Sequence, residues 1–125
     1  MKENNRLTKT ETQVMNALWS LPNGEGRSAE IMEHMPEPKP ALTTLLTFLK
    51  ILKEKGFVES VKMGKAQLFS ARVSREAYTR SYMTEVKNTF FGGSLASLVS
   101  FFAKSEQLSD EEIDEIKRTI ENLKR

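Results

Sequence analysis

A proline-rich segment at residues 36–40, PEPKP, interrupts the helical pattern in the first half of the chain. Proline lacks a backbone amide hydrogen and restricts the residue before it, so a helix that reaches this segment must end there. Beyond it, leucines recur at intervals of three and four, which predicts a helix with one buried stripe: Leu42, Leu45, Leu49 and Leu52. We expect Pro40 in the first turn of this helix and Gly56 at its end.

Two shorter helical patterns precede the prolines. Thr8 and Glu11 have the spacing of a capping box, and the helix that follows is expected to end at residues 22–24, PNG. Ser28 is expected to cap a second helix that runs to Met35.

After Gly56 the pattern changes to that of strands. Residues 57–62 and 66–71 flank Met63-Gly64-Lys65, which predicts a β-hairpin. From Ser74 onward the helical period returns, with a break at Gly92-Gly93, a helical segment at 95–103 and a last helix capped by Ser109.

Helix, helix, turn, helix and hairpin is the element order of a winged helix-turn-helix. The sequence therefore predicts a mainly α fold with a small β-hairpin, with a winged-helix DNA-binding domain at 1–72 and a separate helical region at 73–125. Residues 1–72 carry a net charge of +3 and residues 73–125 a net charge of −1. This difference favours an anionic partner for the first region only weakly.

The helix after the proline turn is the expected reader of double-stranded DNA. Opposite its leucine stripe lie polar side chains that can contact base edges or phosphates, with a leucine at the flank: Thr43, Thr44, Leu46, Thr47 and Lys50. Lys62 and Lys65 surround the hairpin turn, where they can meet phosphates. Taken alone, each of these features also fits ordinary solvent-exposed surface.

Composition argues against most other chemistries. The chain has no cysteine and one histidine, His34, so a thiolate metal site and a serine triad lack their parts. No phosphate-binding glycine motif occurs. We expect no catalytic residue, metal or cofactor. With no apolar run long enough to span a bilayer and no signal-like N-terminus, we expect a cytoplasmic protein without membrane insertion.

Three stretches carry a resemblance to a known family. They are LTKTETQVMNALW near the start, TTLLTFLKILKEKGFV at 43–58 and FFGGSLASLVSFFAKSEQLSDEEIDEIKRTIENL at 90–123. Together they resemble the penicillinase-repressor (BlaI/MecI) family, to which copper-responsive CopY-type repressors are related. The copper-responsive branch relies on C-terminal cysteines, which this chain lacks.

The resemblance implies a homodimeric repressor in which each winged helix binds half of a palindromic operator and the C-terminal helices join the two copies. A tail of three helices has little else to pack against, so its apolar residues are expected to form the dimer interface. The residues expected there are Leu95, Leu98, Val99, Phe101, Phe102, Ile113, Ile116 and Ile120.

The resemblance also implies a route of induction. In this family a membrane-bound sensor detects β-lactam and the repressor is then cut in its C-terminal region, typically between Asn and Phe. Here Phe101 stands in the place of that Asn, so the bond between Phe101 and Phe102 is the candidate cleavage site, although the pair could equally serve only as dimer core. The regulated genes would be those of β-lactam resistance or a related stress. Staphylococcal-type members carry basic residues at the positions of Thr43 and Leu46, so the operator sequence does not transfer.

Two alternatives to this function remain open from the sequence. The first is a winged-helix regulator that a small-molecule ligand, rather than a protease, releases from DNA. The second is a winged-helix module for protein interaction that does not bind DNA.

Overall fold

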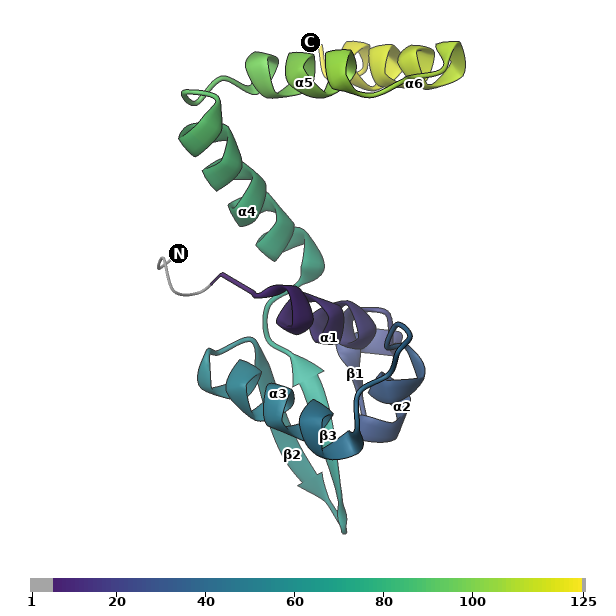
Figure 1. Ribbon diagram of the computed structural model, residues 1–125, viewed down its shortest axis with the longest axis vertical. Coiled ribbons are helices and arrows are strands. Elements are labelled where there is room, and N and C mark those ends of the chain that lie inside the picture. Colours follow the sequence, from purple (N-terminus) through teal and green to yellow (C-terminus); the bar gives the residue numbers. More distant parts are fainter. Residues whose placement is uncertain (1–5, 125) are drawn as a thin grey trace. The chain divides into compact units, whose positions relative to one another are not determined.

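A computed structural model describes residues 6–124 of the chain (Figure 1). The first five residues of the N-terminal segment, for which we expect no signal sequence, lie outside this range. The chain divides into two compact units, Met1–Tyr82 (unit 1) and Met83–Arg125 (unit 2), and the boundary falls inside one helix, α4 (Arg75–Phe90).

Unit 1 contains the helices and strands of a winged helix-turn-helix. In chain order they are α1 (Lys9–Trp19), the 3₁₀ turn η2 (Pro22–Gly24), β1 (Glu25–Gly26), α2 (Ser28–Glu33), α3 (Leu42–Glu54), β2 (Val58–Met63), β3 (Ala66–Ala71) and the first turns of α4. The capping box of α1 is confirmed, because Thr8 Oγ1 accepts from the Glu11 amide at 3.3 Å and the Glu11 carboxylate accepts from the Thr8 amide at 2.9 Å.

Two predicted helix starts were wrong by a small shift. Ser28 is the first helical residue of α2 rather than its cap, and the cap position is Arg27, whose amide donates to the Glu30 carboxylate at 2.8 Å. Pro40 lies before the cap of α3, Ala41, and not inside the first turn. A glutamate three residues after the cap can satisfy the cap amide itself, so a serine at the start is not required.

The end of α3 at Gly56 is confirmed and has a clear physical cause. Gly56 has a positive φ of 88°, its amide donates to the Lys53 carbonyl, and the next amide, of Phe57, donates to the Leu52 carbonyl at 2.9 Å. These two bonds form the Schellman motif, which satisfies carbonyls at the end of the helix. The motif also places the Phe57 ring in the core, where the residue is 2% exposed.

The predicted hairpin is confirmed, with a tighter turn and one additional strand. Met63 belongs to β2 and pairs with Ala66, so only Gly64 and Lys65 form the turn, and Gly64 has a φ of +64°. β1 pairs antiparallel with β3, which gives the strand order β1-β3-β2. Two residues are too few to show an alternating pattern, so the sequence carried no signal for β1.

The core of unit 1 lies between α1, α2, α3 and the sheet. Each of these three helices contributes fully buried side chains. The largest in the core are Phe57, Met15, Leu18, Ile31, Leu45, Leu49, Leu52, Val14 and Val58. Leu42 was expected in the buried stripe of α3, and this was wrong, because Leu42 is 50% exposed. It is the first residue of the helix and lies beyond the edge of the core.

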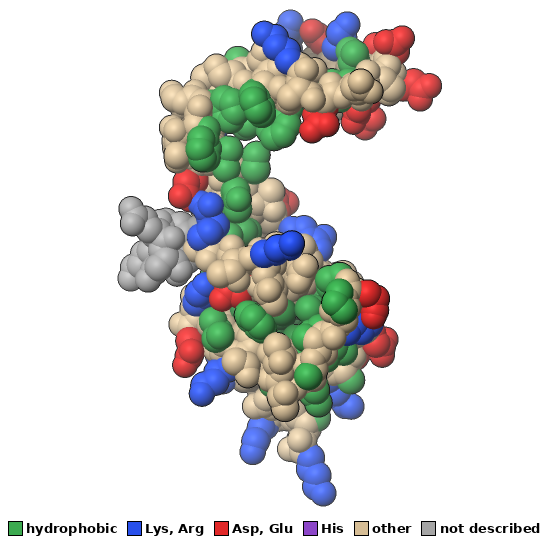
Figure 2. Space-filling model, viewed as in Figure 1, with side chains coloured by type: hydrophobic (Ala, Val, Ile, Leu, Met, Phe, Trp, Pro, Cys, Tyr) green, Lys and Arg blue, Asp and Glu red, His purple; other side chains and the backbone are tan. Residues whose placement is uncertain are grey.

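Unit 2 comprises the last turns of α4, followed by α5 (Leu95–Ser105) and α6 (Asp110–Glu121). The break between α4 and α5 occurs at Gly92 and Gly93, as expected, and both have positive φ. Ser94 and Ser109 cap the two helices by accepting from the amides of Ser97 and Glu112. In the described part of unit 2, Leu98 is the one buried side chain, at 7% exposure, and Figure 2 shows hydrophobic side chains uncovered on these helices.

Candidate nucleic-acid interface

The outer face of α3 carries the predicted reader residues on the side that the core leaves free. Leu45, Leu49 and Leu52 point into the core and are completely buried. The helical period then turns the intervening positions outward, and all five predicted residues on this helix are exposed: Thr43, Thr44, Leu46, Thr47 and Lys50.

Two of these side chains differ in their hydrogen bonding within the protein. Thr47 Oγ1 donates its hydrogen to the Thr43 carbonyl at 2.9 Å, so its methyl group and its oxygen lone pairs remain available. Within residues 6–124, no hydrogen bond or ion pair engages the ammonium group of Lys50. Lys50 therefore offers a cation to an external acceptor.

Leu42 is a residue of this face that the sequence reasoning missed. It lies one helical turn before Leu46, and the two are 50% and 38% exposed, so they form an apolar pair beside the threonines. The leucine spacing alone places Leu42 with the core. Its position as the first helical residue after the proline segment is the signal that could have separated it.

The hairpin carries the two predicted wing lysines close to its tip. Lys65 is in the two-residue turn, and Lys62 pairs across the strands with Gln67. Both are exposed, and Figure 2 shows Lys and Arg side chains around the hairpin tip. On the other face of β2, Val61 and Met63 are also exposed, so the wing combines cations with an apolar side.

Other lysines near α3 form hydrogen bonds that join neighbouring segments of unit 1. Lys39 Nζ donates to the carbonyls of Met32 and Glu33 at 2.8 and 3.0 Å, which ties the proline segment to the C-terminal end of α2. Lys53 Nζ donates to Ser60 Oγ at 3.0 Å and joins α3 to β2. Composition cannot separate these lysines from Lys50, because only their tertiary neighbours differ.

Unit 2 holds an apolar groove with a volume of about 760 Å³ between its helices. Five residues of the predicted dimer interface line it: Leu98, Val99, Phe102, Ile113 and Ile116. The other three are not among its lining residues. Leu95 and Ile120 are exposed, and Phe101 contacts Phe91 on another side of α5, with ring centres 5.6 Å apart.

The candidate cleavage site lies in the C-terminal half of α5. The carbonyl of Phe101 accepts from Ser105 Oγ at 2.7 Å, and the carbonyl of Phe102 accepts from the Glu106 amide at 3.0 Å. Both residues are therefore in hydrogen-bonded helix, although their rings are about half exposed.

No helix within residues 6–124 has both the length and the apolar character that crossing a bilayer requires. Comparison with known proteins identifies a family over almost the whole chain: the family model described as penicillinase repressor matches residues 7–122. The penicillinase repressor of Bacillus licheniformis is 26% identical over 99% of this chain and 96% of its own length. That of Staphylococcus aureus is 24% identical over 94% of this chain and 92% of its own length. With a winged helix and a family match over residues 7–122, the chain thus belongs to the penicillinase repressor family of transcriptional repressors.

Proposed function

We propose that the chain represses transcription as a homodimer on a palindromic operator, with residues 1–72 binding DNA and residues 73–125 joining the copies. The observation that carries the proposal is the exposed face of α3 beside a lysine-tipped wing. In a winged helix, such a helix enters the major groove and the hairpin meets the phosphate backbone.

Each outward side chain of α3 has a defined chemical capacity. Lys50 can donate to guanine acceptors, and Thr43 and Thr47 can bond base edges or phosphates. The exposed pair of Leu42 and Leu46 offers apolar contact to thymine methyl groups. Lys62 and Lys65 on the wing contribute attraction that does not depend on sequence.

The uncovered surface of unit 2 supports the proposed dimer. Phe101 and Phe102 are 54% and 47% exposed, and Val99, Ile116 and Ile120 are 42%, 38% and 49% exposed. A large apolar side chain that becomes fully buried contributes about 1.5–3 kcal/mol. A second copy offers a matching apolar surface through twofold symmetry, so association covers both surfaces at once.

DNA binding is tested by measuring affinity for the DNA upstream of the chain's own gene and for random DNA of equal length at several salt concentrations. A specific repressor prefers the upstream DNA, and its affinity falls steeply as salt rises. Equal affinity for both DNAs would instead favour the interaction module that does not bind DNA.

The leucine contacts can be tested by changing the operator DNA, with a double variant of the protein as the control. In the identified operator, replacing single thymines by uracil removes only the methyl group. For wild type, we expect weaker binding when uracil replaces a thymine that Leu42 or Leu46 contacts. For the double variant Leu42→Ala, Leu46→Ala, the same replacement should leave the affinity unchanged. If wild type bound every uracil-substituted operator with the same affinity as the native one, neither leucine would contact a thymine methyl group.

We further propose that induction cuts the bond between Phe101 and Phe102 through the action of a membrane-bound sensor protease. Proteases favour exposed, flexible backbone, so the helical hydrogen bonds of α5 must open before cleavage. Mass spectrometry of the repressor from β-lactam-treated cells tests this, and the expected fragment ends at Phe101. Release of intact repressor from DNA would instead indicate a small-molecule inducer.

A further inference from the structure

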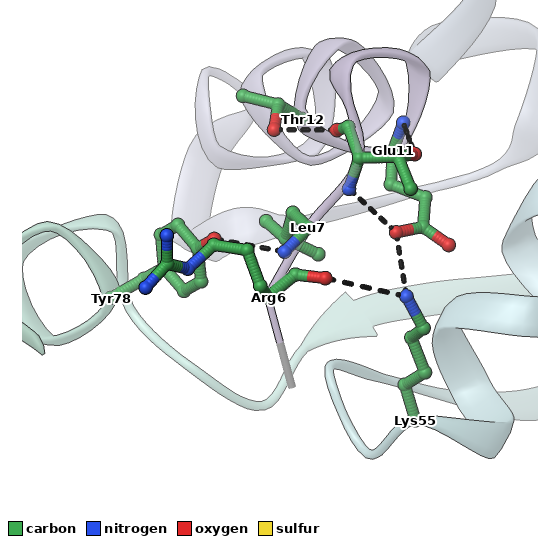
Figure 3. Close-up of polar contacts among 7 residues, drawn as sticks. Arg6, Leu7, Glu11, Thr12, Lys55 and Tyr78 are labelled. Atoms are coloured by element: carbon green, nitrogen blue, oxygen red, sulfur yellow. Dashed lines mark hydrogen bonds and ion pairs between the residues drawn. The ribbon is translucent and has the colours of Figure 1, made fainter. Parts of the chain in front are cut away.

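The segment before α1 links α3 to α4 in unit 1 (Figure 3). The Leu7 amide donates to the Tyr78 hydroxyl of α4 at 2.9 Å in a buried site. Lys55, the C-cap residue of α3, donates to the Arg6 carbonyl at 3.4 Å and to Glu11 Oε1 at 2.8 Å. We call Arg6, Leu7, Lys55 and Tyr78 the N-terminal clasp.

Aromatic contacts reinforce the clasp on the side of α4. The Tyr78 ring lies 5.7 Å from Phe57 and 6.2 Å from Trp19, measured between ring centres. The Arg6 guanidinium carbon lies 4.1 Å from the centre of the Tyr82 ring, one helical turn after Tyr78. Cation–π contact of this kind adds attraction between the segment and α4.

Packing alone leaves part of this side of α4 uncovered. A cleft of about 280 Å³ lies among residues that include Lys55, Val73 and Tyr78. A helix that is not packed along its whole length retains some freedom to tilt, and a directional hydrogen bond restricts such freedom more than apolar contact does. The bond between Leu7 and Tyr78 is therefore well placed to set the direction of α4.

We propose that Tyr78 is a positioning residue for operator binding, because the clasp fixes the direction in which α4 leaves the unit that carries the reader helix. This inference rests on the proposed function. α4 carries the chain from unit 1 into unit 2, so the direction in which it leaves unit 1 bears on how the second reader helix of a dimer approaches its half-site. Fixing it in advance removes an ordering cost that binding would otherwise carry.

The experiment compares Tyr78→Phe with wild type on three duplexes: a single half-site, the native palindrome, and the palindrome with base pairs inserted between its halves. Tyr78→Phe keeps the ring and removes only the hydroxyl. Tyr82→Phe is the matched control, because it keeps the ring that Arg6 contacts. Sedimentation and thermal unfolding verify that each variant remains folded and dimeric.

For Tyr78→Phe we expect about fivefold weaker binding to the native palindrome, the factor that corresponds to one ordinary hydrogen bond of about 1 kcal/mol. Affinity for a single half-site should be unchanged, and the preference for native over expanded spacing should fall. The Leu7 amide should also exchange its hydrogen faster, which reports loss of the bond itself. Tyr82→Phe should match wild type in every measurement.

An equal loss of affinity for the half-site and the palindrome would show a merely structural role for Tyr78 and overturn the inference. A ratio of palindrome to half-site affinity equal to that of wild type would also overturn it. So would an unchanged hydrogen-exchange rate at the Leu7 amide. Failure of the proposed function is distinguishable from these results. In that case wild type itself would not prefer the palindrome to unrelated DNA, and both proposals would fall together.

Discussion

The two units differ in how much of their apolar surface is buried. In unit 1, Leu45, Leu49 and Leu52 of α3 lie on one stripe and are completely buried, and the outer face of the helix is mostly polar. In unit 2, α5 carries apolar residues on more than one side, and Leu98 alone among them is buried. A helix whose apolar surface exceeds what its own unit can cover requires a partner, whereas a one-sided helix is complete within its unit and can use its free face for binding.

The largest expected effect comes from placing a charge in the groove of unit 2. Phe102→Asp should separate the proposed dimer, because the carboxylate would have to be buried against apolar side chains. Operator affinity should then fall about 1000-fold through lost avidity, as measured by fluorescence anisotropy alongside sedimentation. The control is Asn122→Asp, which adds the same charge at an exposed position. Equal oligomeric state in the two variants would break the contrast between the units.

A cavity in the core of unit 1 should act on stability rather than on assembly. Leu49→Ala should lower the free energy of unfolding by about 3 kcal/mol, because Leu49 is fully buried in a closed core. Denaturation at fixed protein concentration measures this. Leu42→Ala on the same helix removes an exposed leucine and should cost less than about 0.5 kcal/mol. Equal losses would contradict the assignment of the two leucines to opposite environments.

The ion pair of Glu11 with Lys55 should make the stability of unit 1 depend on pH. Burial raises the pKa of Glu11, but the hydrogen bonds from Lys55 and the Thr8 amide, together with the charge of Lys55, outweigh it and hold the pKa below its ordinary value of 4.5. A lowered folded-state pKa contributes stability above the unfolded pKa, and this is lost as pH falls through the folded pKa.

Glu11→Gln should therefore lower the free energy of unfolding by about 2 kcal/mol at neutral pH and flatten its decline below pH 4.5. Urea denaturation across the acidic range measures both effects. The control is Glu76→Gln, whose ion pair with Arg80 is exposed and should contribute almost nothing. An unchanged acidic slope in Glu11→Gln would show that other carboxylates carry the pH dependence.

The smallest expected effect is at the end of α3. Gly56→Ala should cost about 1 kcal/mol, because a side chain at a φ of +88° is strained even though a Cβ there would meet nothing within 4 Å. Gly56→Asn should cost less, since asparagine tolerates this conformation better. Thermal unfolding measures both, and a larger loss for asparagine would argue for steric conflict instead of backbone strain.

Much of unit 1 could be predicted from sequence because its signals are local. The capping box at Thr8, the helical period of α3 and Gly56 at its end each act within a few residues, and each was confirmed except for the burial of Leu42. The two-residue strand β1 could not be predicted, because its pairing with β3 depends on residues more than 40 positions away. A Cβ at Gly26 would lie 2.6 Å from a methyl carbon of Leu21, so a larger residue there would require the Leu21 side chain to shift.

By itself the sequence determined the order of the helices and the hairpin, the mostly polar outer face of α3 and the excess of apolar residues in the tail, because periodicity and turn chemistry are local properties. Only the tertiary structure decided which lysines hold the fold and which face solvent, that Leu42 lies outside the core, and that Leu7 is bonded to Tyr78. These depend on neighbours distant in the chain, and contact between such neighbours is fixed only when the whole core has packed.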